Sequence, residues 1–107
     1  MPNNYKNAKL DLTTTDATTL YTTPAATTAL VKSILVSEDT GSADTITVTI
    51  TDADAAVFSL FKVKAVAANT TVELLTEPLV VQENEILKVT AATANRLHVV
   101  ASLLEIN

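Results

Sequence analysis

The amino-acid sequence predicts an all-β protein, a single antiparallel β-sandwich of jelly-roll or immunoglobulin-like type with about eight strands. Threonine is the most frequent residue, and valine and isoleucine are common. These β-branched side chains favour strands over helices. Short apolar segments recur along the chain between polar turn sequences. A length of 107 residues corresponds to one domain.

The clearest strand covers residues 45–51, where Ile46, Val48 and Ile50 alternate with threonines. Such alternation predicts one buried side and one side facing solvent. The expected strands, in chain order, are 6–12, 18–23, 29–37, 45–51, 58–66, 70–75, 78–81, 86–91 and 97–106.

Two of these expected strands are apolar on both faces. In residues 29–37, strict alternation puts Val31 and Leu35 on one face and Ile34 on the opposite face. The strand expected at 97–106 has the same character. A strand on the surface of a sandwich needs only one apolar face, so we expect both to be central, bulged or covered by a partner.

The turns between the strands use Asn and Asp where many proteins use glycine, since Gly41 is the only glycine in the chain. Both residue types tolerate the left-handed backbone conformation that tight turns require. We expect residues 1–12 to form an N-terminal arm or the first edge strand, and residues 13–107 to form the sandwich domain.

Composition argues against several functional classes. The net charge is −5 and the basic residues are scattered, so no nucleic-acid partner is expected. The chain has no cysteine, which excludes disulfides and thiolate metal sites. No apolar run has the length of a membrane span, and the polar N-terminus lacks the apolar core of a signal peptide. We therefore expect no membrane partner and synthesis in a cytoplasm.

The residues with possible catalytic or metal-binding chemistry each have a simpler structural explanation. His98 is the only histidine and falls inside an expected strand, without the pattern of a nucleophile–base pair. Turn formation is the simpler role of the acidic residues Asp52, Asp54, Glu83 and Glu85. We expect no catalytic residue, no metal site and no cofactor.

The chain has more apolar strand faces than one sandwich core uses. Around residues 58–61 the apolar side chains break simple alternation. Either a bulge returns them to the core, or they form an interface in an oligomer or assembly. The candidate residues for a subunit or shell interface are Tyr5, Phe58, Leu60, Phe61, Leu104 and Ile106.

Several segments resemble small virion structural proteins of tailed bacteriophages, especially those of marine phages. The most characteristic are Tyr-Thr-Thr-Pro-Ala at 21–25, Val-Lys-Ser-Ile at 31–34 and the terminal Leu-Glu-Ile at 104–106. The resemblance extends from Tyr5 to Ile106. Relatives often carry glycine where this chain has Ala26 and Asn69, and these differences concern the geometry of two turns.

The resemblance implies a capsid decoration or cement protein that binds the outer surface of the shell and stabilises it. Its partners would be the major capsid protein and copies of itself, in a homo-oligomer such as a trimer, and its location would be the virion. The polar segment 1–7 would become ordered on the shell. The alternatives are a neck, tail or fibre-associated virion protein, or a receptor- or carbohydrate-binding module.

Overall fold

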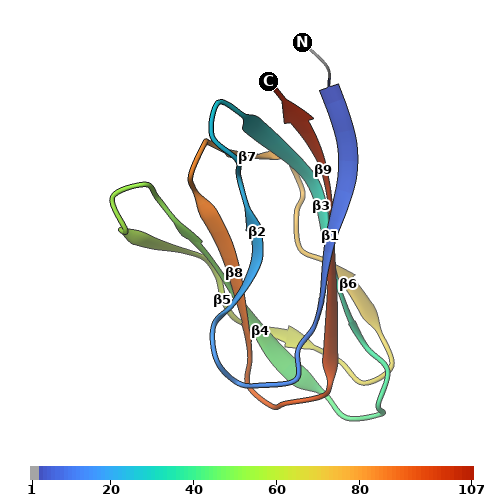
Figure 1. Ribbon diagram of the computed structural model, residues 1–107. Helices are drawn as coiled ribbons and strands as arrows, with labels where there is room; N and C mark the ends of the chain where they lie inside the picture. Colours follow the sequence, from blue (N-terminus) through green and yellow to red (C-terminus); the bar gives the residue numbers. More distant parts are fainter. Residues whose placement is uncertain (1–2) are drawn as a thin grey trace.

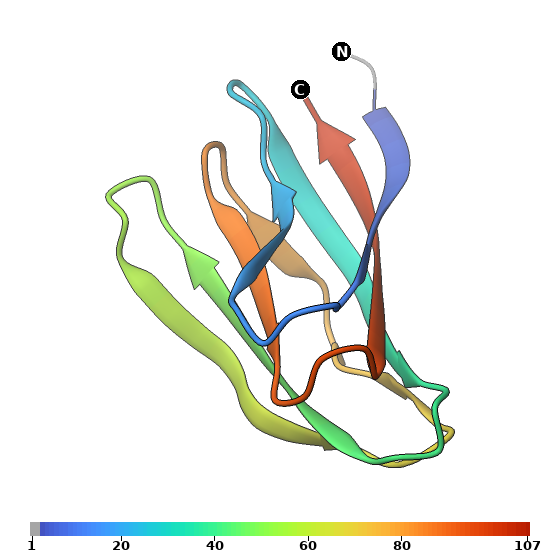
Figure 2. The same cartoon turned by 60° about the horizontal axis from the view of Figure 1, so that its bottom comes forward.

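Two antiparallel sheets pack face to face in the computed structural model, which describes residues 3–107 (Figures 1 and 2). The predicted all-β class is confirmed, and the described residues contain no helix. The strands are β1 (Asn3–Asp11), β2 (Thr18–Thr22), β3 (Thr28–Glu38), β4 (Asp44–Thr51), β5 (Val57–Val66), β6 (Thr71–Glu73), β7 (Leu79–Val81), β8 (Ile86–Ala91) and β9 (Leu97–Ile106). Every segment expected from the sequence overlaps one of them.

The order of the strands is that of a jelly roll. The first sheet runs β1-β9-β3-β6, with β7 also paired to β3, and the second runs β2-β8-β4-β5. Because β7 pairs with residues 29–31 and β6 with residues 35–37 of β3, the two act as one interrupted strand. The chain is then an antiparallel ribbon that pairs its first strand with its last and its second with its second-last, rolled into two sheets. Of the two sandwich types predicted, the immunoglobulin-like order is not the one observed.

The core lies between the sheets and contains the inward-facing residues that alternation predicts. In β4, Ile46 and Val48 are fully buried, while the threonines between them lie half-buried on the outer side. Strand β9 alternates in the same way, with Leu97, Val99 and Leu103 inside. The other fully buried aliphatic side chains among the described residues are Leu12, Ala29, Val31, Ile34, Val36, Val66, Val81, Leu87, Val89, Ala91 and Ala101.

Strand β3 contains a β-bulge between Val31 and Ser33. The extra residue shifts the alternation, so Val31 and Ile34 both face the core and are fully buried. The prediction that Val31 shares a face with Leu35 is therefore wrong, because it assumed a regular strand. Leu35 instead lies on the outer side of the sheet and is 39% exposed. Strand β3 is also central in its sheet, so it is both bulged and central, which are two of the three explanations expected for its apolar faces.

Glu73 of β6 fills the gap between β6 and β7, where β3 has no strand partner. Its carboxylate accepts hydrogen bonds from the amides of Ile34 (2.8 Å) and Leu75 (3.1 Å) and from the Ser33 hydroxyl. Burial raises the pKa of Glu73, but these hydrogen bonds outweigh it and lower the pKa below its ordinary value. A side chain thus replaces ladder hydrogen bonds at the edge of β3 between its partners β7 and β6.

A buried tyrosine–carboxylate pair connects the two sheets. The Tyr21 hydroxyl of β2 donates to the Glu105 carboxylate of β9 at 2.5 Å, and both residues are less than a tenth exposed. Burial, together with this hydrogen bond, raises the pKa of Tyr21 above its usual range. Lys6 of β1 lies 3.6 Å from the same carboxylate and so ties the edge strand to the pair. Of the segment expected to form an arm, residues 3–7 belong to β1, and residues 1–2 lie outside the described residues.

The turns adopt the left-handed conformation expected of their Asn residues. Asn69, Asn84 and Asn95 have φ values of 57°, 65° and 65°. Ala26 also has a positive φ, 57°. The backbone geometry of these turns is therefore kept without glycine, at a steric cost to Ala26.

Glu38, at the end of β3, joins two loops at one end of the sandwich. It is 2% exposed, and its carboxylate accepts hydrogen bonds from the amides of Thr40 (2.9 Å), Gly41 (3.1 Å) and Asn69 (3.0 Å). The Thr40 hydroxyl donates to it as well. Burial raises the pKa of Glu38, but the hydrogen bonds to its ionised form outweigh burial and lower the pKa to about 2.

Acid should weaken the fold through Glu38. Its folded-state pKa of about 2 lies below the ordinary value of 4.5, so its stabilising effect is full above pH 5 and is lost as the pH falls toward 2. We predict that Glu38→Gln lowers the melting temperature by several degrees at pH 7 and has little effect at pH 2. Thermal denaturation followed by circular dichroism measures both, with the exposed Asp54→Asn as control. An equal loss at the two pH values would contradict this role.

Candidate functional site

The six predicted interface residues lie on two separate surfaces. Tyr5, Leu104 and Ile106 project from β1 and β9 on the outer face of the first sheet. The other three lie on β5, an edge strand of the second sheet. The predicted interface residues therefore form two groups of three, one on each sheet, and do not make a single site.

The first surface, which we call the outer face, is the solvent-facing side of β1, β9, β3 and β7. The strand register aligns Tyr5 with Leu104, Leu104 with Leu30, and Leu30 with Val80. Directly opposed residues in neighbouring strands share a face, so these four side chains form one apolar row across the sheet. Tyr5 is 75% exposed, Val80 52% and the flanking Ile106 42%.

A second row on the outer face is apolar in its centre and basic at one end. It aligns Lys9 with Val100 and Val100 with Leu35. Between the two rows, the bulged Lys32 places its ammonium 5.8 Å from the centre of the Tyr5 ring, within the range of a cation–π interaction. The outer face thus combines aliphatic and aromatic side chains with two lysines.

Sequence reasoning identified only part of this surface. Leu30 and Val80 were not among the predicted interface residues. Leu30 belongs to a strand already predicted to be apolar on both faces, which is a usable signal. Val80 belongs to a three-residue strand, and its position opposite Leu30 follows only from the pairing of β7 with β3.

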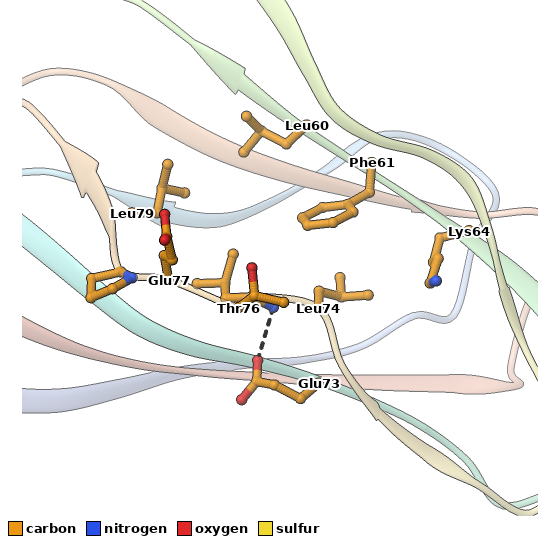
Figure 3. Close-up of a pocket in the computed structure, with 10 residues that line it drawn as sticks. Leu60, Phe61, Lys64, Glu73, Leu74, Thr76, Glu77 and Leu79 are labelled. Carbon is orange, nitrogen blue, oxygen red and sulfur yellow. Dashed lines mark hydrogen bonds between the residues drawn. The ribbon is translucent and has the colours of Figure 1, made fainter.

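The second surface is a groove of about 550 Å³ between β5 and the segment of residues 73–79 (Figure 3). Leu60 and Phe61 project from β5 toward Leu74 and Leu79 on the opposite wall. Lys64 and Glu77 also line it.

Strand β5 is bulged, which decides between the two explanations for its apolar residues. The pairing of β5 with β4 shifts twice, and Val63 adopts a φ of 52° while its amide donates to the Thr47 hydroxyl at 3.0 Å. The bulges turn Leu60 and Phe61 toward the core, against which they pack half-buried. Phe58, beyond the bulges, remains 55% exposed. The core explanation therefore fits Leu60 and Phe61, and the surface explanation fits Phe58.

The polar candidates take structural roles among the described residues. His98 lies on the outer side of β9, with Nε2 3.3 Å from Asp11 and Nδ1 3.8 Å from Asp39. Asp52 Oδ1 accepts the amides of Asp54 and Ala56, both at 2.9 Å, which forms the predicted turn.

The acidic residues of the β7–β8 turn also serve the backbone. Glu83 accepts the Ala26 amide and Glu85 the Gln82 amide, both at 2.7 Å. Within residues 3–107, no group of three or more His, Cys, Asp or Glu is placed to hold a metal ion. The same residues include no helix of the length and apolarity needed to cross a membrane.

Comparison with protein-family models and with curated proteins gives no match for this chain. The resemblance to phage virion proteins therefore stays a prediction from the sequence.

Substitutions on β5 should distinguish the core residue Leu60 from the exposed residue Phe58. Leu60 packs against the core, so Leu60→Ser should reduce the free energy of unfolding by roughly 1–3 kcal/mol. Phe58→Ser removes an exposed ring and should cost less than about 1 kcal/mol. Urea denaturation of both variants, with Ser59→Ala on the same strand as control, makes the comparison. Equal losses for Phe58 and Leu60 would place Phe58 in the core and contradict the assignment.

Proposed function

We propose that this protein is a structural component of a tailed-bacteriophage particle, and within it a decoration protein that binds the outer surface of the capsid and stabilises the shell. The observation that carries the proposal is the outer face. A contiguous row of exposed and half-buried apolar side chains crosses four strands, and apolar patches of this size on soluble proteins are often functional interaction surfaces.

The fold supports this proposal without deciding it. Jelly rolls are common among viral capsid domains and also occur in lectins and cupins. A fold alone does not assign a function. The resemblance of residues 5–106 to phage virion proteins favours the first of these groups.

The properties of this chain are compatible with those that a decoration protein needs. It needs no reaction chemistry, and the candidate acidic residues are occupied with turns. It binds in many copies, so weak contacts add up through the repeating lattice. A neck, tail or fibre protein would share the fold and the surface, and it differs in being present in few copies.

Copy number and particle stability test the proposal. Quantitative mass spectrometry of purified particles should find this chain at hundreds of copies, comparable to the capsid subunit. Particles that lack it should release their genome at a lower temperature in a fluorescence-based melting assay. A few copies per particle would instead support the neck, tail or fibre alternative, and absence from particles would refute the proposal.

A pair of variants tests whether the outer face makes the attachment. Leu104→Glu puts a charge in the middle of the apolar row, so we predict at least about a tenfold loss of occupancy on particles. Thr49→Glu places the same charge on a central strand of the other sheet and should leave occupancy unchanged. Circular dichroism confirms that both variants fold. The opposite pattern would assign attachment to the second sheet.

A further inference from the structure

We infer that the outer face docks onto a protein surface that is itself apolar and carries carboxylates, and that this face does not pair with its own counterpart on a second copy. The inference deepens the proposed function and rests on it for the identity of the partner. The chemistry of the partner follows from the residues of the face itself.

Two basic side chains, those of Lys9 and Lys32, lie beside the apolar rows of the outer face. Lys9 ends one row and Lys32 covers the Tyr5 ring, and within the described residues neither lysine lies in an ion pair. Glu73, at the far end of the Lys9 row, is engaged in three hydrogen bonds to Ser33 and to backbone amides. Asp11 and Asp39, beyond the Lys9 row, lie against His98 at 3.3 and 3.8 Å. The charged groups beside the apolar rows that make neither a hydrogen bond nor an ion pair are therefore those of the two lysines.

These charges distinguish between classes of partner. A symmetric contact between two copies would place the same patch on both sides, and so would enclose four lysine charges in one interface. A nucleic acid or an anionic membrane is a dense array of negative charge, and the chain as a whole carries a net charge of −5. An apolar protein surface with a few carboxylates complements the two lysines without meeting that repulsion.

The size of the face indicates a contact that is weak when made singly. Strand spacings put its area at roughly 400 Å², about half of what each partner contributes to a standard protein interface. Copies of this chain that are joined to one another through a different surface would bind a repeating partner with avidity. The repeating shell of the proposed function provides such a partner.

Cross-linking in cells that produce the particle tests the inference. A photo-reactive residue at Val80, on the outer face, should cross-link to a different protein, whereas the same residue at Ser59, on an exposed edge strand of the other sheet, should not. A carbodiimide, which joins a lysine amine to a contacting carboxylate with loss of water, should link Lys9 or Lys32 to the same partner. Lys9→Arg/Lys32→Arg keeps the charges and should retain the photo-cross-link while losing the amide link.

Charge reversal supplies the decisive comparison. Lys9→Glu/Lys32→Glu should reduce the photo-cross-link from Val80 about tenfold, and Lys62→Glu/Lys64→Glu on β5 should leave it unchanged. Cross-links from Val80 to another copy of this chain, no more product than from Ser59, or no effect of charge reversal would each overturn the inference. If the partner is acidic but foreign to the particle, the inference stands and the proposed function fails.

Discussion

The bulge in β3 is the constraint on which both the core and the outer face depend. By adding one residue between Val31 and Ser33, it lets Val31 and Ile34 both enter the core and turns Leu35 outward. One long strand can then serve as partner to β7 on one side of the bulge and to β6 on the other. Between these two partner strands, the Glu73 carboxylate accepts hydrogen bonds from the Ile34 amide and the Ser33 hydroxyl of β3.

The core is complete without the apolar side chains of the outer face, and this surplus is the basis for the proposed attachment. Burying roughly 400 Å² of mostly apolar surface on each partner would contribute at most about 20 kcal/mol. Association costs on the order of 4–15 kcal/mol, and imperfectly paired polar groups add to this cost. A single contact of this kind is therefore marginal, whereas several contacts made by joined copies are not. The geometry of one strand thus connects the packing of the monomer to a function that depends on many copies.

Local patterns in the sequence were sufficient to predict the strands, the half-buried threonine face of β4 and the left-handed Asn turns, because each depends on a few neighbouring residues. The sequence allowed either a jelly-roll or an immunoglobulin-like order and could not decide between them, since the order depends on pairings between residues far apart, such as Asn3 with Ile106. A bulge was among the explanations considered for the apolar faces of β3 and β5, but its position was not predictable, because alternation assumes an unbroken register. Tyr5 and Leu104 were both predicted as interface residues, but only the register shows that they are direct neighbours.

A cryo-electron microscopy reconstruction of the intact particle tests the central claim most directly, because it shows both where the chain lies and which side it buries. If the outer face makes the attachment, we expect density for the two-sheet domain at regular positions on the shell. Leu104 and Val80 should lie against the neighbouring protein, and the threonines of β4 should face solvent. Density in which the outer face is open to solvent, while the β4 side or the β5 groove is buried, would contradict it.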